Sequence, residues 1–452
     1  MRTAKGDMVW RRVLLSALVG LVLWPCVTAA APIWDPQDLP AAVRVVLGEA
    51  GGLMDKGKVD EAVEKLLAFE ARGRSTEGGD GTPHAVYSHP MIHFALGNAY
   101  LLQAAHGRAR QAFEQAVGLH PDWVPAWLNL AKTHYELDAP AEAARCFFMA
   151  YEKGEEKDAE HLYLSAASHL MARQYDAAVA RFDQLLARHP EQMRPEWREH
   201  LVHALLSNDQ PRRALFHIRR LAGIYDGDKR IQWQEILLHQ YMQLEMHADA
   251  LALARDLVDE APTLAKWWKA KAHLHLNTQD HAPALVAMIV YSYLTDLTRE
   301  EQQLLADLHL QVGIPDRAAP LYESLLQAGA ADKRVVRHLV TALRRIDRAD
   351  AALARLESHP ASGEDPDLLM LRADLLYEME RYAEAAGAYR RAAARNSRQA
   401  GQAWLMAGYA AWRTEDWAAS RQAFERAARF ERQRKPALTA MRRLQNQQSR
   451  AN

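Results

Sequence analysis

The sequence has little cysteine and little strand-type patterning, and both shortages narrow the range of folds. Only two cysteines, Cys26 and Cys146, occur in 452 residues, which excludes a disulfide-rich scaffold. Alternating runs of Val, Ile and Thr are rare, while Ala, Leu, Arg and Glu dominate, so strong helix formers fill most of the chain. These shortages favour an all-helical fold, in which Cys146 is expected to be a small buried residue rather than a reactive thiol.

The chain also lacks an excess of charge of either sign. Lys and Arg together number 56 and Asp and Glu 57, for a formal net charge of −1. A balanced chain has no global field that would draw it onto nucleic acid or anionic lipid. We therefore expect no nucleic-acid partner.

Signatures of catalysis and of metal binding are absent from the sequence as well. There is no Gly-rich phosphate loop, no cysteine pair and no His-Glu-x-x-His motif. Twenty histidines raise the question of a metal site. His89 and His93, and likewise His200 and His203, lie about one helical turn apart, but neither pair has a third ligand at an obvious spacing. We expect no enzyme, no cofactor and no metal, with a metal-binding protein kept as a minor alternative.

The N-terminus has the pattern of a secretory signal. A basic stretch precedes an apolar run from Val13 to Leu23, and small residues up to Ala31 offer a cleavage site, which we place after Ala30. An uncleaved anchor is the competing interpretation, although the apolar run is short for a membrane span and is followed by Pro25. The signal predicts a periplasmic protein that contacts the membrane only through partners or through an uncleaved anchor.

What the sequence contains in abundance is an internal repeat. The segment from Pro90 to Trp123 places small and large apolar residues at fixed positions, counted with Pro90 as place 1. They are Leu96, Gly97, Tyr100, Ala109, Phe113, Ala116 and Pro121, at places 7, 8, 11, 20, 24, 27 and 32. This order and the 34-residue length resemble the tetratricopeptide repeat (TPR).

The same frame recurs along most of the chain. The next repeat contains Trp127, Leu130, Ala131 and Phe147, and later repeats start near Ala159, Pro195, Ile231, Ala265, Arg299, Asp332, Pro366 and Gly401. A divergent leader precedes them. Small residues at places 8, 20 and 27 would let two helices approach closely, and successive helix pairs would stack into one core. The resemblance implies an all-α, right-handed superhelical solenoid of about ten to eleven repeats.

Turn-forming and capping segments divide the chain. We expect a signal peptide at 1–30, an N-terminal segment with a divergent repeat at 31–72, a flexible loop at 73–89, a TPR array at 90–434, and a capping helix and tail at 435–452. The expected capping helix has Leu438, Met441 and Leu444 on one face.

The candidate binding site is the concave face, which in a TPR solenoid is formed by the first helix of each pair. Places 2, 5, 9 and 12 should point into it. A merely solvated face would contain more charges and fewer Met, Tyr and Trp, so the mixture found there suits a groove for a peptide or helix. The candidate residues are Phe94, Asn98, Asn129, Lys132, Tyr135, His239, Lys269, His273, Asp374, Tyr377, Tyr409 and Trp412. The alternative is a face that is only solvated or packed against itself.

Two narrower resemblances, to particular groups of TPR proteins, bear on the partner. The TPR subfamily that clamps C-terminal carboxylates has asparagines matched here by Asn98 and Asn129. Its basic residues are not matched, because Phe94, Glu160 and Leu164 stand in their place. Carboxylate clamping is therefore not expected, and the two asparagines are kept as amides that could bind a peptide backbone.

The second resemblance covers Ala265 to Glu323, with Trp267-Trp268, the stretch Leu297-Thr298-Arg299-Glu300-Glu301 and Gly313-Ile314-Pro315. This segment is similar to periplasmic TPR proteins encoded beside TonB–ExbB–ExbD systems. The resemblance implies an accessory that binds TonB, ExbB or ExbD and serves outer-membrane transport. A scaffold for outer-membrane assembly or secretion is the alternative.

Overall fold

The protein is all-helical wherever its structure is described. The computed structural model describes residues 39–73, 84–329, 332–359, 363–395 and 399–451, and these ranges contain helices and turns but no strand. The expected signal peptide and its cleavage site lie outside these ranges. Among the helices of the described ranges, none combines the length and the apolar character needed to cross a membrane. The chain divides into two compact units, Met1–Glu245 and Met246–Asn452.

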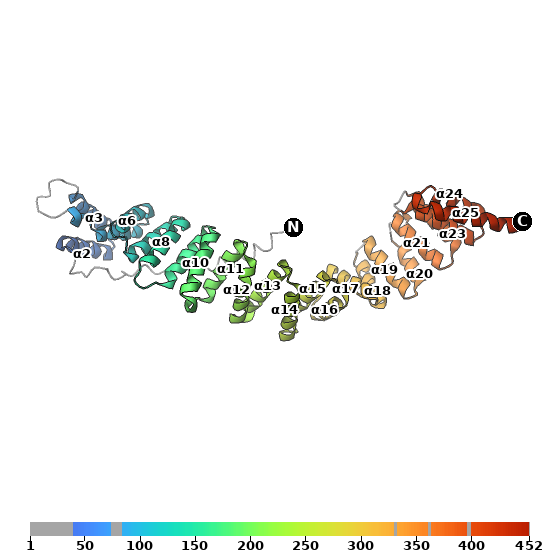
Figure 1. Cartoon of the computed structure of the whole chain (residues 1–452), viewed down its shortest axis with the longest axis horizontal. Helices are drawn as coiled ribbons and strands as arrows, with labels where there is room; N and C mark the ends of the chain where they lie inside the picture. The colour runs from blue at the N-terminus through green and yellow to red at the C-terminus, as the bar shows by residue number, and fades with distance from the viewer. Residues whose placement is uncertain (1–38, 74–83, 330–331, 360–362, 396–398, 452) are drawn as a thin grey trace. The chain divides into compact units, whose positions relative to one another are not determined.

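The first unit is a succession of helical hairpins (Figure 1). Its hairpins are α2 (Ala41–Asp55) with α3 (Val59–Arg72), α5 (Pro90–Leu102) with α6 (His106–Leu119), α7 (Val124–Glu136) with α8 (Pro140–Lys153), α9 (Ala159–Met171) with α10 (Tyr175–Arg188), and α11 (Pro195–Ser207) with α12 (Pro211–Ile224). The short helices α4 (His84–Tyr87) and η1 (Pro190–Gln192) and the longer α13 (Gly227–Gln243) complete it. The expected 73–89 loop thus contains α4, and residues 74–83 of it lie outside the described ranges.

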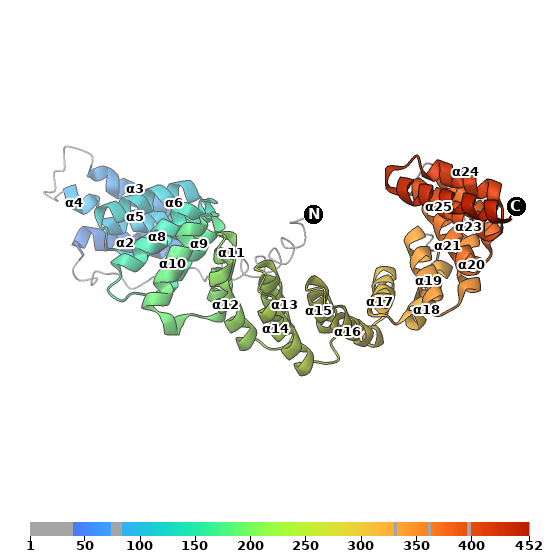
Figure 2. The same ribbon diagram turned by 45° about the vertical axis from the view of Figure 1, so that its right-hand side comes forward.

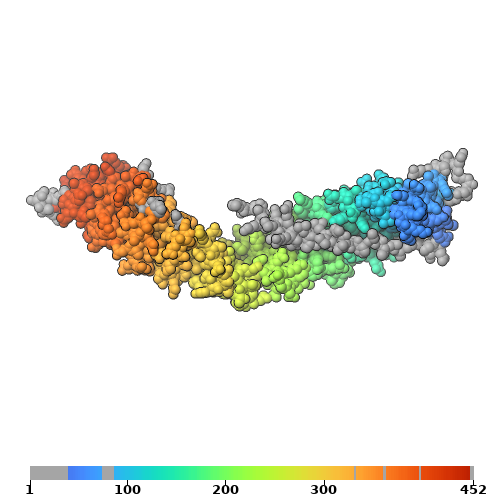
Figure 3. Space-filling model, turned by 180° about the vertical axis from the view of Figure 1, so that it is seen from behind, coloured from blue at the N-terminus to red at the C-terminus, as the bar shows by residue number. Residues whose placement is uncertain are grey.

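The second unit repeats the same hairpin (Figure 2). After α14 (His247–Glu260) come α15 (Ala265–Asn277) with α16 (His281–Leu294), α17 (Arg299–Val312) with α18 (Pro315–Gln327), α19 (Lys333–Arg345) with α20 (Ala349–Glu357), α21 (Pro366–Glu378) with α22 (Tyr382–Ala394), and α23 (Ala400–Arg413) with α24 (Trp417–Ala427). The last helix is α25 (Glu431–Ala451). Within each unit the repeats follow one another in chain order (Figure 3).

A left-handed residue closes the first helix of every hairpin from α5 onward. These residues recur 33 to 36 positions apart and have φ between 53° and 87°. They are Ala104, Asp138, Arg173, Asp209, Glu245, Gln279, Gly313, Asp347, Glu380 and Glu415. The next backbone N–H bonds back into the helix, as Ala105 N–H does to the Tyr100 carbonyl at 2.8 Å, which is the Schellman arrangement. The turn therefore marks place 15 of each repeat.

The position of the left-handed residue corrects the expected start of one repeat. The repeat expected to start near Asp332 has its left-handed residue at Asp347, so place 1 is Lys333. The sequence contained a sign of the shift. The earlier frame put Arg355 at place 24, which is a buried position, whereas the corrected frame puts Leu356 there, fully buried.

In most repeats a small residue at place 8 allows the hairpin to close, as the sequence predicts, whereas Val202, Leu238 and Val340 occupy this place in three others. A Cβ atom added to Gly97 would lie 2.5 Å from the Phe113 ring, and one added to Gly408 would lie 2.5 Å from the Phe424 ring. Both phenylalanines occupy place 24 and are fully buried. The two helices are therefore in contact through a glycine on one and an aromatic ring on the other.

The last helix packs differently from expectation. It begins at Glu431, and Ala437, Ala440 and Leu444 are its buried residues. Leu438, expected on the apolar face, is 43% exposed. The helix starts earlier than the sequence suggested, so Pro436 lies inside it and not at its first position.

Candidate functional site

The candidate site is the face formed by places 2, 5, 9 and 12 of the first helices, here named the first-helix face. In the first unit it begins on α5 and α7. Phe94 of α5 is half-buried because its ring packs 4.5 Å from Trp123 and 5.7 Å from Phe113, measured between ring centroids. Phe94 is therefore packed within this face and is not an exposed side chain on which a partner could anchor.

Asn98 and Asn129 are brought together across two repeats. The Asn129 Nδ2 donates a hydrogen bond of 2.8 Å to the Asn98 Oδ1. Asn129 is 3% exposed, while Asn98 is half-buried. The pair joins α5 to α7, so the group that still faces outward is the Asn98 amide. Lys132 and Tyr135 follow on α7, both half-buried, with Tyr135 packed against the core.

Further along the first unit, the same face is lined by bonded aromatic and polar side chains. The Tyr163 ring stacks 4.5 Å from Trp197, and its hydroxyl lies 2.8 Å from the His200 Nδ1. Burial lowers the pKa of His200 to about 4, so its ring is neutral at pH 7. On α11, Glu199 pairs with Lys229 at 2.6 Å. His239 on α13 is exposed and is not joined to the other candidates by any bond among the described residues.

In the second unit, Lys269 is held within the face. Its Nζ lies 2.6 Å from the Glu301 Oε1, and the Tyr291 hydroxyl donates to the same oxygen at 3.0 Å. The other Glu301 oxygen accepts from the Thr298 N–H and closes a capping box at the start of α17. These donors, Lys269 first, lower the pKa of Glu301 to about 2. His273, one turn after Lys269, is exposed.

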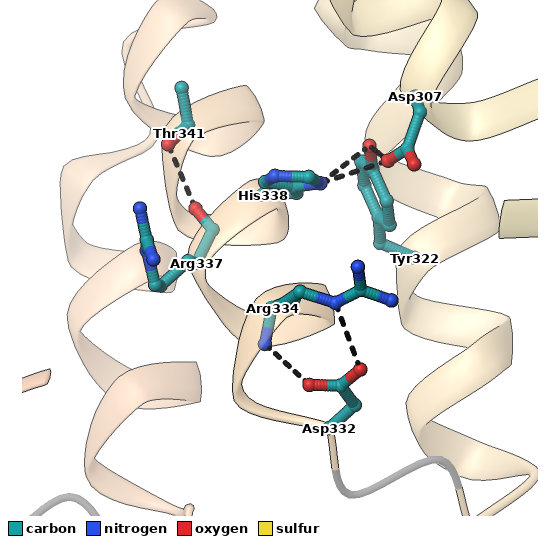
Figure 4. A network of polar contacts seen from close by, with 7 residues as sticks. All are labelled: Asp307, Tyr322, Asp332, Arg334, Arg337, His338 and Thr341. Atoms are coloured by element: carbon teal, nitrogen blue, oxygen red, sulfur yellow. Dashed lines mark hydrogen bonds and ion pairs between the residues drawn. The ribbon is translucent and has the colours of Figure 1, made fainter. Parts of the chain in front are cut away.

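Two repeats share an acid–phenol pair between places 9 and 24. Figure 4 shows the first pair, in which the Asp307 carboxylate accepts from the Tyr322 hydroxyl and lies 2.8 Å from the His338 Nδ1. In the second, the Tyr389 hydroxyl donates to Asp374 at 2.6 Å. Burial raises the pKa of Asp374. Both tyrosines are fully buried, so the phenols fix each carboxylate at the edge of the face.

Sequence reasoning missed the basic part of this face because of the register shift. With Lys333 as place 1, places 2, 5, 9 and 12 of α19 are Arg334, Arg337, Thr341 and Arg344. Arg334 pairs with Asp332 at 3.2 Å (Figure 4), and Arg344 pairs with Glu378 at 3.1 Å. Arg337 is exposed and forms no ion pair with any residue that the structure describes.

The basic helix lies between acidic ones. Its neighbours carry Glu300 and Asp307 on α17, and Asp367 and Asp374 on α21, at the equivalent places. Charges of opposite sign therefore alternate from helix to helix, and several are already paired between repeats. This is the arrangement of a face that partly packs against itself and leaves Arg337 available.

The aromatic candidates at the end of the array have intramolecular contacts. Tyr377 is half-buried and lies 5.2 Å from the Tyr382 ring. Tyr409 and Trp412 pack against Phe424, and the Trp412 indole N–H donates to Gln447 of α25 at 3.1 Å. These side chains help to seat the last helix, and their remaining exposed surface is what a partner could reach.

The sequence raised the questions of a reactive cysteine and of a metal site formed by histidines. Cys146 is buried, as predicted, and burial raises the pKa of its thiol to about 12, so the thiolate is not formed at pH 7. Within the described ranges, no group of three His, Cys, Asp or Glu side chains is placed so that it could hold a metal ion.

Comparison with known families identifies the repeat. The family described as Tetratricopeptide repeat matches residues 47–123 and 370–436, and a second family of the same description matches residues 162–191. Both units therefore contain tetratricopeptide repeats, and the first match includes the divergent leader. No curated protein matches the chain.

Solved structures with some likeness include proteins described as tetratricopeptide repeat proteins. A tetratricopeptide repeat protein from Parabacteroides merdae is 15% identical, with 67% of this chain and 100% of that chain covered and a TM-score of 0.29. Yeast Tom70 is 14% identical, with 90% and 96% covered and a TM-score of 0.30. YrrB, described as having an unusual peptide-binding site, is 16% identical, with 41% and 93% covered and a TM-score of 0.31. At such scores none of the three bears on function.

The fold and the family matches agree on a coarse assignment. The chain is an all-helical tetratricopeptide-repeat solenoid, and repeats of this kind are protein-interaction scaffolds.

Proposed function

We propose that this scaffold acts in the periplasm as an accessory of a TonB-type energy-transducing complex that serves outer-membrane transport. The secretion signal supports the compartment. The similarity of Ala265 to Glu323 to TPR proteins encoded beside TonB–ExbB–ExbD systems supports the partner. That segment forms α15 to α18, with Trp267 buried and the capping box at Thr298 formed. The proposed partners are TonB, ExbB or ExbD.

The observation that carries the binding role is the exposed, unpaired Arg337 on the first-helix face. Arg334 and Arg344 on the same helix are paired with Asp332 and Glu378, whereas Arg337 forms no ion pair with any residue that the structure describes. An arginine on a face of half-buried Met and Tyr side chains suits a carboxylate on a partner peptide or helix. The proposal includes no catalytic step.

An in-cell crosslink and pull-down of the tagged mature protein tests the proposal. Recovery of TonB, ExbB or ExbD above a control periplasmic bait would support it. The charge reversal Arg337→Glu should then reduce recovery by about tenfold, as loss of an interface arginine commonly does. The matched control is Arg317→Glu on the second helix α18, a site that is 75% exposed and lies off the first-helix face.

Two further variants map the rest of the face, since Asn98→Ala removes the outward amide and Tyr409→Ala removes an aromatic contact. If the dominant crosslinks went to outer-membrane assembly or secretion components, the TonB assignment would be wrong and the scaffold assignment would remain.

A further inference from the structure

The outer face of α16 is apolar along its whole length. Val286 is 59% exposed, Tyr293 85% and Leu294 36%, and no other helix in the described part of the chain has as many exposed large apolar residues. Ala282 is exposed too, and Ile289 and Val290 are half-buried on the same side. His281 and Ser292 are the only polar residues of the helix, and the Ser292 hydroxyl bonds to the Ile289 carbonyl.

The exposed apolar face of α16 is separate from the side of the helix that packs in the core. The opposite side of α16 supplies the buried residues Ala284, Leu285, Ala287, Met288 and Tyr291, which pack within the stack of α15, α16 and α17. A second helix of a repeat normally turns charged residues to solvent, as α18 does with Asp316, Arg317 and Glu323. An apolar face left over after the core has formed marks an interaction surface.

The face contains a projection and a hollow. Tyr293 projects into solvent two helical turns after Val286. Beside Val286, an open apolar hollow lies between α15 and α16, which are side by side in Figure 2. It is lined by Trp268, Lys271, Ala282, Pro283, Val286 and Ala287. The Trp268 indole N–H is already bonded to the Pro262 carbonyl, so the ring offers apolar surface.

We propose that a second copy of this chain binds here, with the two α16 helices antiparallel about a two-fold axis near Ile289 and Val290. Antiparallel pairing places Tyr293 of each copy opposite Val286 and the hollow of the other. Tyr293 and the hollow lie on the same face of one helix. A single two-fold axis therefore places the Tyr293 of each copy in the hollow of the other, as an isologous contact requires. The spacing of seven residues between Val286 and Tyr293 keeps them on the same side of the helix.

The absence of charge on this helix favours a second copy over a membrane surface, and the small area of the face limits how tightly that copy binds. A helix without Lys, Arg, Asp or Glu meets itself without repulsion, whereas an interfacial membrane helix needs a strongly basic polar face. One helix face is smaller than the roughly 800 Å² per partner of a standard interface. The dimer is therefore reversible and forms at high protein concentration.

Sedimentation of the full chain over a wide range of concentrations tests this proposal. The wild type should shift from monomer towards dimer as its concentration rises. Tyr293→Asp and Val286→Asp should each weaken dimerisation by about tenfold or more, the effect of burying an unpaired charge at an interface centre. Phe216→Asp is the matched control, since Phe216 is 62% exposed on the second helix α12 of the other unit and should leave the dimer unchanged. Circular dichroism checks that each variant is folded.

A double variant, Val286→Cys with Tyr293→Cys, gives an independent readout. Two turns separate the residues by roughly 11 Å along one helix, too far for a disulfide within a chain. Oxidation should therefore yield a dimer linked between copies, and the two single-cysteine variants are the controls. Cys146 is buried and Cys26 is replaced by serine in all three variants, so neither native cysteine competes.

A wild type that stays monomeric at every soluble concentration overturns the proposal, and so does a dimer that persists in both Asp variants. A monomer that instead binds phosphatidylglycerol vesicles through Val286 and Tyr293 would assign the face to a membrane. None of these outcomes depends on the partner recovered in the pull-down.

Discussion

At the scale of single residues, two glycines of the same repeat array have opposite roles. Gly408 lies against the Phe424 ring, whereas a Cβ atom added to Gly387 in the middle of α22 meets nothing within 4 Å. We expect Gly408→Ala to lower the free energy of unfolding by about 1–3 kcal/mol, because the helix pair must open to admit a methyl group. Gly387→Ala should raise it by about 0.5–1 kcal/mol through helix propensity. Urea unfolding of both variants checks the signs, and a stabilising Gly408→Ala would mean that the hairpin is not in close contact there.

Buried histidines make the stability of the first unit depend on pH. Burial, aided by Arg198, lowers the pKa of His217 to about 4, and His200 and His203 are lowered to about 4 as well. The unfolded chain takes up protons below its ordinary histidine pKa of about 6.5, while the folded chain does not until about pH 4. Stability is therefore complete above pH 6.5 and declines as the pH falls towards 4.

The substitution His217→Gln isolates one part of this decline. A glutamine oxygen can still accept the hydrogen bond that Arg198 donates to the His217 Nδ1 at 2.9 Å, but it does not titrate. The melting temperature of the variant should fall less than that of the wild type between pH 6.5 and 4. His247→Gln, at an exposed site on α14, is the control and should follow the wild type. Identical slopes for all three proteins would refute the assignment.

At the scale of elements, the last helix tests which side chains seat it. Leu444 is 2% exposed and Leu438 is 43% exposed on the same helix. Leu444→Ala should cost about 2–4 kcal/mol of unfolding free energy because it leaves a cavity under the last helix. Leu438→Ala should stay within about 0.5 kcal/mol of the wild type. Denaturant unfolding of the matched pair measures both, and equal losses would mean that the face predicted from the sequence is the correct one.

The helical hairpins were predictable from the sequence because their packing requires small and large residues at places that recur with a fixed period. Glycines at place 8 and phenylalanines at place 24 appear in the sequence as they pack in the structure. The turns were harder, because nine of the ten left-handed residues are not glycine and leave no clear signal. The register of α19 was therefore misplaced by one residue, and the basic places 2, 5 and 12 were overlooked.

The candidate site was less predictable than the fold for a related reason. The helical period shows that a side chain faces a groove, but not whether a neighbouring repeat already binds it. Asn129 and Lys269 lie on first helices, yet Asn98 of the preceding repeat bonds to Asn129 and Glu301 of the following repeat bonds to Lys269. Such pairs join residues more than thirty positions apart. A 34-residue period predicts that these residues lie in neighbouring repeats, but it does not predict which of them form hydrogen bonds.

At the scale of the whole molecule, the array should transmit local damage only to neighbouring repeats. Each repeat packs against the repeats before and after it, so stability is close to a sum of local and nearest-neighbour contributions. A substitution that opens one hairpin should therefore loosen its own unit and leave the other nearly unchanged. Gly97→Ala in the first unit and Gly408→Ala in the second supply a symmetric pair, because a Cβ atom would lie 2.5 Å from a buried ring in each.

Hydrogen exchange followed by mass spectrometry measures this directly. Gly97→Ala should speed exchange in peptides from α5 to α8 while peptides from α21 to α24 keep their wild-type rates, and Gly408→Ala should do the reverse. Local opening free energies should fall by about 1–3 kcal/mol in the affected unit, in line with overpacking of a core. If either variant accelerated exchange equally in both units, the chain would unfold as one cooperative body, and the division after Glu245 would have no energetic meaning.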